Sequence, residues 1–277
     1  MALRDNIAIS AMPQNKFSGG FTIMKRSKVI VAITVFMLAV VCCGTSFAKE
    51  RLIRYKASKG EQTKYKMNMH GETTIYVEDQ TQVTLIDNEM LLTQRVTEFD
   101  KKKSMITFQT RIDSGKMNIN GVASPLPMIG QVLQTKMLTN GEVLSSIGAA
   151  NQSLDNMQLV FPEKPVKKGS TWKTEIPANT QVPVPLIMRY KAIAFEKYKG
   201  RNCVKLATSI KSGKKSEIEG MSLELDAKGR IYFDVDKGQM VSNRVNSDMR
   251  MVLKRVIGGK NTSIITRMEM KVRLEIQ

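Results

Sequence analysis

Side chains for metal and redox chemistry are scarce in this 277-residue chain. It contains one His and three Cys, too few ligands for a structural zinc site and too few thiols for a disulfide framework. The sequence also lacks Gly-x-Ser-x-Gly, His-Glu-x-x-His and phosphate-loop motifs. We therefore predict a protein that is not an enzyme and uses no cofactor or metal. A hydrolase built on a carboxylate pair stays open, because strands distant in sequence can bring two carboxylates together.

Aromatic and acidic residues are also few. Phe, Trp and Tyr make up 6% of the chain, and 25 Asp plus Glu oppose 43 Lys plus Arg, for a formal charge of +18. Apolar residues at 42% and charged residues at 25% are ordinary globular usage, which excludes wholesale disorder. No nucleic-acid recognition motif is present, and charge alone gives only nonspecific, salt-sensitive binding. The sequence therefore predicts no specific nucleic-acid partner.

Residues 24–48 have the organisation of a signal peptide. Three basic residues at 25–28 precede an apolar run over 29–41, and small residues at 46 and 48 mark a cleavage site. We predict cleavage after Ala48, with 1–23 as a mis-called or extended N-terminus, and an extracytoplasmic, periplasmic or secreted protein. The alternatives are an uncleaved N-terminal anchor, because 29–48 carries no charge, and a lipid-modified Cys42 or Cys43.

Cleavage changes the composition of the working protein. The leader takes five basic residues, one acid and two Cys with it, so the remaining 229 residues carry +14 and only Cys203. A lone Cys closes no intramolecular disulfide. In its Val-Lys-Leu context we interpret Cys203 as a buried small apolar residue.

The C-terminus predicts two long antiparallel strands. Apolar residues occupy odd positions over 241–253 and even positions over 264–276, and this period of two indicates half-buried strands. A two-residue loop at Gly259-Lys260 would place Met249 opposite Met270 and Met251 opposite Met268 on one face. The other face would pair opposite charges, namely Arg250 with Glu269, Asp248 with Lys271, and Arg244 with Glu275.

Glycine, asparagine and proline predict further turns and one helix. We expect a hairpin at Ser114-Gly115, a second at Asn140-Gly141, and an odd-length loop between Phe233 and Val241 with Gly238 left-handed. Asp234 and Asp236 in that loop are interpreted as turn residues, because a calcium site needs more oxygen ligands. Leu154, Met157 and Val160 predict a short helix near 151–160. Pro177, Pro183 and Pro185 predict a loop or an edge strand.

An internal repeat organises the chain. Phe99 to Lys116 resembles Phe195 to Lys214, and a Gly followed by an aromatic-Lys pair precedes each copy, at Gly60 and at Gly169. We predict one β domain over 49–277 with pseudo-repeats at about 55–145 and 166–277. The predicted fold class is all-β, with long antiparallel strands in a curved, partly open barrel built from two similar halves.

Methionine and lysine supply the candidate binding residues. The predicted mature chain holds 15 Met and 12 aromatics, and Met is common on surfaces that accept varied apolar partners. The candidate apolar face comprises Met67, Met69, Met249, Met251, Met268 and Met270; its alternative is a plain Met-rich core. Two matching basic turns are candidates for contact with an anionic membrane surface: Lys101, Lys102, Lys103, Lys197, Lys199 and Arg201. Their alternative is solvated turns that protect sheet edges. His70 is predicted on the polar face as a solvated residue rather than a catalytic one.

Several motifs carry a family resemblance. They are Phe161-Pro-Glu-Lys-Pro-Val-Lys-Lys-Gly-Ser-Thr-Trp172, Gly229-Arg-Ile-Tyr-Phe-Asp234, Gly238-Gln-Met240 and Asp248-Met-Arg-Met251. The chain resembles an uncharacterised family of exported bacterial β-proteins marked by Pro-Val-x-x-Gly-x-x-Trp. More loosely, the wrapped sheet is similar to periplasmic lipoprotein carriers that shelter acyl chains in a half-barrel. The motifs are turn and strand residues, so the resemblance implies no active site.

Together these patterns predict an exported, non-enzymatic β-protein that binds a hydrophobic ligand, lipid or lipoprotein at or near the cell envelope. The alternative is a structural or scaffold protein of the envelope whose apolar face is simply core. An open apolar concave face favours the first, and a concave face filled by its own side chains favours the second.

Overall fold

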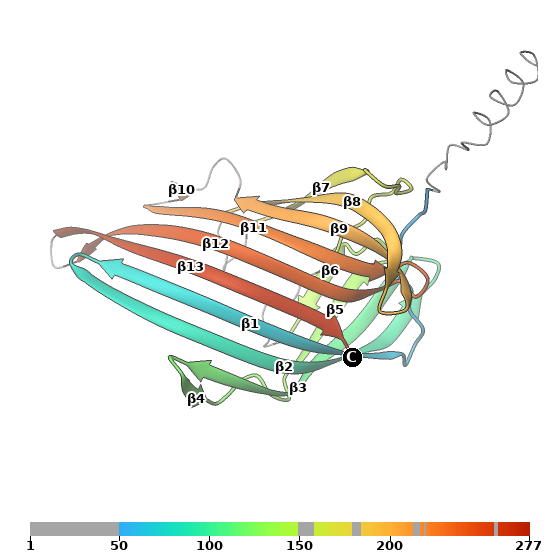
Figure 1. The fold of residues 1–277 in the computed structure, drawn as a ribbon, viewed down its shortest axis with the longest axis horizontal. Helices are drawn as coiled ribbons and strands as arrows, with labels where there is room; N and C mark the ends of the chain where they lie inside the picture. The colour runs from blue at the N-terminus through green and yellow to red at the C-terminus, as the bar shows by residue number, and fades with distance from the viewer. Residues whose placement is uncertain (1–49, 149–157, 179–183, 213–216, 219, 258–259) are drawn as a thin grey trace, which may run out of the picture. The chain divides into compact units, whose positions relative to one another are not determined.

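The computed structural model describes residues 50–148, 158–178, 184–212, 217–218, 220–257 and 260–277. Residues 48–277 form one compact unit of antiparallel strands (Figure 1). The strands are β1 Gln62–Val77, β2 Gln80–Asp100, β3 Met105–Ile119, β4 Val122–Ser124, β5 Val132–Leu138, β6 Val143–Ile147, β7 Thr171–Ile176, β8 Leu186–Tyr198, β9 Arg201–Ser212, β10 Glu217–Ile218, β11 Met221–Asp234, β12 Gln239–Ile257 and β13 Lys260–Ile276.

All thirteen strands belong to one sheet. Its order is β6-β5-β3-β2-β1-β13-β12-β11-β9-β8-β7, with β4 beside β3 and β10 beside β11. The sheet is curved but not closed, because β6 and β7 end the order without pairing with each other. In Figure 1 the long strands β1, β12 and β13 lie in front of the shorter β5 and β6. The predicted all-β fold with an open, curved sheet is confirmed.

The predicted helix is not seen. Residues 151–157 lie outside the described residues, and 158–160 have no regular structure. Leu159 is buried at 1% exposure in the core, so its apolar character serves packing rather than a helical face. In the part of the chain that the structure describes, no helix is long and apolar enough to span a membrane. The predicted leader, 24–48, also falls outside the described residues.

The β12–β13 register differs from the prediction by two residues. Ile257 pairs with Lys260, so Met249 lies opposite Met268 and Met251 opposite Thr266. Like charges therefore face each other directly, as in Arg250 with Arg267. The shift is even, so every side chain stays on its predicted face. The predicted Arg244–Glu275 ion pair still forms, along a diagonal, with 3.1 Å between Arg244 Nη2 and Glu275 Oε1.

The Ser114-Gly115 hairpin is also wrong, because both residues lie within β3. Gly115 pairs with Met90 of β2. A Cβ at Gly115 would lie 2.5 Å from Leu126 Cδ2 and 2.6 Å from the carbonyl oxygen of Glu89. Close packing, and not a turn, explains the glycine at this position.

Other turns agree with the sequence. Gly238 has a φ of +62°, and Gly141 follows β5 in a tight turn, with its N–H donating to the carbonyl of Leu138 at 2.8 Å. The loop before β12 spans four residues, 235–238, rather than an odd number. A bulge at Val241 supplies the missing residue: Tyr232 pairs with Ser242, and Phe233 pairs with Met240. Pro177 directly follows β7, which ends the strand order as an edge strand.

The two predicted halves have matching backbone contacts. The strand orders β6-β5-β3-β2-β1 and β12-β11-β9-β8-β7 correspond one to one, with β13 between them. Gly60 N–H donates to the Val96 carbonyl and Gly169 N–H to the Ala192 carbonyl, both at 2.8 Å. These glycines have φ values of +88° and +90°. Each bond lies beside a bulge, after Val96 in β2 and after Ala192 in β8.

The main core fills one end of the concave face, here called the closed end. Two segments, 50–61 and 158–166, run across the sheet there and are joined by the Arg51–Val166 bridge. Phe233 and Phe161 are 0% and 2% exposed, and their ring centroids lie 4.7 Å apart. Tyr55 meets Phe233 edge-on at 5.0 Å, and its hydroxyl accepts the Leu159 N–H at 3.0 Å. Burial raises the pKa of Tyr55 well above its ordinary value.

Candidate functional site

The six predicted methionines all lie on the concave face. Odd residues of β1 and β12 and even residues of β13 point inward, as the buried Met67 and its partner Leu274 show. Met67 is 6% exposed and packs with Tyr65, Met90 and Leu92. The other five are half-buried. The structure therefore brings the predicted apolar set onto one continuous face.

Two apolar clusters flank an interval on this face. One surrounds Met67, and the other surrounds Val184, Leu186 and Leu223, against which Met249 and Met251 pack. Among the described residues, Met69, Met268 and Met270 belong to neither cluster. Adjacent strands bring these three close to small residues: Met270 lies opposite both Gly71 and Ser247. We call this interval the methionine trough, defined by Met69, Gly71, Ser247, Met249, Met268 and Met270.

The backbone at Gly71 can accept a larger side chain without a clash. Within 4 Å of a Cβ built at Gly71 there is one heavy atom, the carbonyl oxygen of Glu269, at 3.7 Å. Gly229 also lies on the concave face, but its Cβ would meet Thr208 Oγ1 and the Arg244 carbonyl oxygen, both at 2.7 Å. The same residue type therefore marks a filled position in one place and an empty one in the other.

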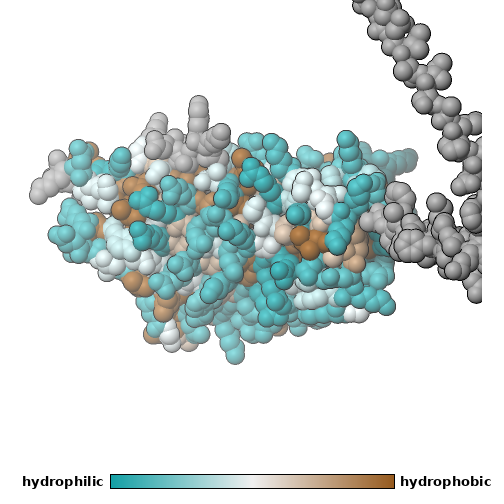
Figure 2. Space-filling model, turned by 45° about the horizontal axis from the view of Figure 1, so that its top comes forward, coloured by the Kyte–Doolittle hydropathy of each residue, from teal (hydrophilic) through white to brown (hydrophobic). Residues whose placement is uncertain are grey.

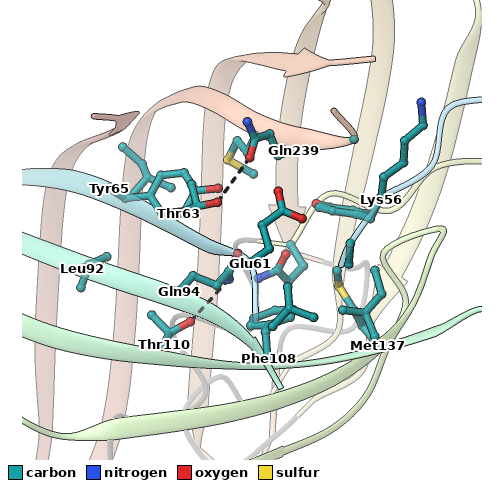
Figure 3. Close-up of a pocket in the computed structure, with 18 residues that line it drawn as sticks. Lys56, Glu61, Thr63, Tyr65, Leu92, Gln94, Phe108, Thr110, Met137 and Gln239 are labelled. Carbon is teal, nitrogen blue, oxygen red and sulfur yellow. Dashed lines mark hydrogen bonds between the residues drawn. The ribbon is translucent and has the colours of Figure 1, made fainter. Parts of the chain in front are cut away.

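A cavity of about 100 Å³ lies between the core of the closed end and the apolar cluster around Met67. Figure 3 shows its lining. Phe108 and Met137 supply apolar surface, and the Glu61 carboxylate extends toward Gln239 of β12. Thr63 Oγ1 donates to Gln239 Oε1 at 3.3 Å. Tyr65 also lines the cavity, and burial raises the pKa of its phenol well above the ordinary value.

Two buried asparagines add unpartnered acceptors to the concave side. Asn88 of β2 is 9% exposed and Asn243 of β12 is 6% exposed. Neither Oδ1 atom has a hydrogen-bond partner among the described residues. Asn88 lies opposite Met69, and Asn243 lies opposite Leu274. A buried polar atom without a partner costs free energy, so a hydrogen-bond donor beside these amides would relieve that cost.

The predicted basic turns lie at the closed end but differ in their partners. Lys101, Lys102 and Lys103 are exposed in the β2–β3 turn. In the β8–β9 turn, Lys199 Nζ lies 3.1 Å from Glu275 Oε2, and Arg201 Nη1 lies 3.4 Å from Asp234 Oδ2. Lys199 and Arg201 therefore have intramolecular partners, although Lys199 is exposed, as is Lys197 near the end of β8.

Glu275 is the centre of a charge network on the opposite, convex face. Burial alone would raise the pKa of Glu275, but hydrogen bonds from Arg273, Lys199 and Arg244 outweigh it and lower the pKa to about 2. Asp234 also accepts more than one hydrogen bond: its Oδ1 accepts the backbone N–H groups of Asp236 and Lys237 at 2.9 and 3.0 Å. Those bonds support the interpretation of this loop as turn chemistry.

His70 lies on the convex face, as predicted, but it has a partner that the sequence did not reveal. Its Nδ1 lies 2.6 Å from Asp87 Oδ1 across the β1–β2 pair, and both side chains are more than half exposed. The register His70 opposite Asp87 could have been found from the β1–β2 turn. The lining of the surrounding groove includes no Ser, Thr or Cys, so the pair has no hydroxyl or thiol nucleophile there.

Cys203 is buried at 1% exposure among core residues. Burial raises the pKa of its thiol to about 11. The thiol is therefore protonated at neutral pH and weakly nucleophilic, in agreement with its interpretation as a small apolar residue. In the described residues no group of three or more His, Cys, Asp or Glu side chains is arranged to hold a metal ion.

Comparisons with known proteins add little. No protein-family profile and no curated protein matches the chain. Among solved structures, the chain is similar to DynF from the dynemicin biosynthesis pathway of Micromonospora chersina, with 8% sequence identity over 82% of this chain and 85% of that chain. The TM-score is 0.21, a likeness too distant to carry an argument. The resemblances to an exported family and to lipoprotein carriers stay predictions.

Proposed function

We propose that the protein is an exported, non-enzymatic carrier that binds the apolar chain of a lipid or lipoprotein in the methionine trough. The observation that carries the proposal is the open space above Gly71, bordered by half-buried methionines. Flexible, polarisable Met side chains adapt to apolar ligands of varied shape, and concave apolar sites with few polar groups are the usual form of lipid sites.

The trough also offers a place for a polar head. The unpartnered Oδ1 of Asn88 lies beside Met69 on the same face. A hydroxyl or amide N–H on the ligand would satisfy that acceptor. This chemistry favours a hydroxylated or amide-linked acyl group over a plain hydrocarbon.

A second candidate is a structural protein of the envelope with no ligand. The closed end favours it, because Phe161 and Phe233 are almost fully buried on the concave face there. In this alternative the half-buried methionines are the rim of an ordinary core, and a defined protein partner is expected in crosslinking. Both candidates place the protein outside the cytoplasm through the predicted leader.

The deciding experiment compares two leucine substitutions in the same strand. Gly71→Leu fills the trough, whereas Thr74→Leu places the same side chain on the convex face, where Thr74 lies opposite Arg267. The protein is purified from cells that express the full chain, and bound lipid is examined by native mass spectrometry. Binding of the fluorescent apolar probe N-phenyl-1-naphthylamine is then titrated after extraction.

We expect wild type and Thr74→Leu to carry lipid and to bind the probe, and Gly71→Leu to bind at least tenfold more weakly with an unchanged unfolding midpoint. Absence of lipid and probe from wild type would contradict the proposal and favour the structural alternative. Equal binding by the two variants would place any ligand away from the trough.

A further inference from the structure

A band of cations crosses the convex face over six adjacent strands, β7 to β13 in the sheet order, and all of them except β9 contribute to it. Its members alternate with inward residues such as Tyr190, Ile231 and Leu274, and they are exposed. The basic band comprises Lys173, Arg189, Lys191, Lys228, Arg230, Arg244, Lys271 and Arg273. From β7 to β13 it spans five strand spacings, about 24 Å. Figure 2 shows the outer surface, where hydrophilic side chains predominate with smaller apolar patches between them.

Strand pairing brings like charges together within the band. Lys173 lies directly opposite Arg189. Arg230 lies opposite Arg244, which in turn lies opposite Arg273, so three guanidinium side chains follow one another on adjacent strands. Like charges directly opposite each other are destabilising. The fold therefore retains an arrangement that is unfavourable for the isolated protein.

In the part of the chain that the structure describes, counter-charges reach only one end of the band. Arg244 and Arg273 share Glu275, at 3.1 and 2.7 Å. Among the described residues, no hydrogen bond or ion pair links the side chains of Lys173, Arg189, Lys191, Lys228 or Arg230 to a partner. Five exposed cations on neighbouring strands are thus available to an external anion.

The surface between these cations is grooved. A depression of about 690 Å³ is floored by small residues of β9, Ala207 and Ser209. Arg189 of β8 and Lys228 of β11 stand on either side of Ser209, since both pair with it. The two walls are two strand spacings apart, roughly 10 Å. A narrow chain bearing anionic groups fits between them, within reach of both rows of cations.

An acidic row beside the band restricts the partner. Asp226, Asp248, Glu269 and Glu72 lie opposite one another on β11, β12, β13 and β1. Asp226 and Glu269 stand two residues along their strands from Lys228 and Lys271, about 7 Å away. Asp248 stands four residues from Arg244, and Glu72 lies on β1, the next strand beyond the band. A broad anionic surface such as a bilayer would contact both rows and be repelled by the second. A linear polyanion can follow the band without crossing the acidic row.

The composition of the band distinguishes among linear polyanions. Single-stranded nucleic acids bind where exposed aromatic side chains stack on bases. The two rings that line the groove, Trp172 and Tyr190, stack on each other with centroids 5.1 Å apart, and Tyr190 is 2% exposed. The nearby Tyr198 and Tyr232 stack on each other, with ring centroids 3.8 Å apart. Thr171 and Ser209 line the groove, and Asn246 lies beside Lys228; these side chains suit sugar hydroxyls. We propose that the basic band binds a linear anionic polysaccharide, independently of the trough.

The test compares two variants that lose the same charge. Lys173→Gln, Arg189→Gln and Lys228→Gln are combined in a band variant. Lys101→Gln, Lys102→Gln and Lys103→Gln are combined in a turn variant, because that exposed basic turn lies outside the band. Affinity for a heparin octasaccharide is measured by calorimetry across a salt series on the full chain, with thermal unfolding as the check on folding.

We expect the band variant to bind heparin at least tenfold more weakly, with a shallower salt dependence, and the turn variant to change less than threefold. Heparin should also raise the unfolding temperature of wild type but not of the band variant. Equal losses in the two variants would overturn the proposal, because net charge alone would then explain binding. Oligo-dT or anionic vesicles binding more tightly than heparin, with the same dependence on the band, would also overturn it.

Discussion

The closed end and the methionine trough occupy the same concave face but are filled differently. At the closed end, Tyr55, Phe161 and Phe233 pack with ring centroids 4.7 to 6.1 Å apart. In the trough, half-buried methionines surround Gly71 and Ser247. Large rigid rings fill space and fix geometry, whereas flexible side chains beside small residues leave space that can adapt. The difference teaches that one face of a sheet can be a tightly packed core at one end and a looser, half-buried surface at the other.

The largest expected effect separates the two regions by stability. Phe233→Ala removes a fully buried ring and should lower the free energy of unfolding by about 3–5 kcal/mol. Met268→Ala removes a half-buried side chain from the trough and should cost roughly 1 kcal/mol. Urea unfolding of both variants measures the difference. Equal losses would mean that the trough is as tightly packed as the closed end.

A second pair compares glycines that face inward. Gly115→Ala places a Cβ 2.6 Å from the Glu89 carbonyl oxygen and should destabilise the fold by about 1–3 kcal/mol through overpacking. Gly71→Ala meets only an ordinary contact and should leave stability unchanged or raise it by roughly 0.5 kcal/mol. Thermal unfolding of the two variants is the measurement. A loss at Gly71 as large as at Gly115 would show that the trough has no free space.

The smallest effect concerns the charge network near the closed end. The folded pKa of Glu275 is about 2, below the ordinary value of 4.5, so its stabilisation is complete above pH 4.5 and is lost as pH falls toward 2. Glu275→Gln should therefore be less stable than wild type at pH 7 by about 1–2 kcal/mol, given screening by solvent. The gap should close between pH 4.5 and 2.

Chemical denaturation at fixed pH values across that range gives the comparison. Lys66 provides a control. Its partner Glu89 is exposed and, among the described residues, is not held by several cationic donors as Glu275 is. Lys66→Gln should shift stability little at any pH. A constant gap between wild type and Glu275→Gln down to pH 2 would contradict the lowered pKa.

The sequence pattern predicted the sheet face of each side chain better than it predicted which residues pair across strands. Alternation placed Met249 and Met268 on one face, and the structure agrees, because a two-residue shift preserves side-chain direction. The alternation did not show which two residues near Gly259 form the loop, since several small residues there suit a tight turn. At Gly115 the pattern was misleading for another reason: glycine marks close packing as readily as it marks a turn.

The candidate site was predicted in part. The methionine set follows from periodicity alone, and so does the placement of His70 on the polar face. The Asp87 partner of His70 depends on the register of the β1–β2 hairpin, which the pattern did not assign. The Glu275 network and the basic band required strand order, because they join residues from strands that are distant in the sequence. Cross-strand neighbours depend on registers that a single chain does not display.

The sequence by itself determined an all-β chain, the inward residues of its long strands and the left-handed turn at Gly238. These features depend on local backbone preferences and on a period of two, which neighbouring residues express directly. The tertiary structure alone decided that the closed end is filled, that Gly71 faces open space and that eight cations form one band. Those properties depend on which atoms meet across strands, and only the folded sheet sets those distances.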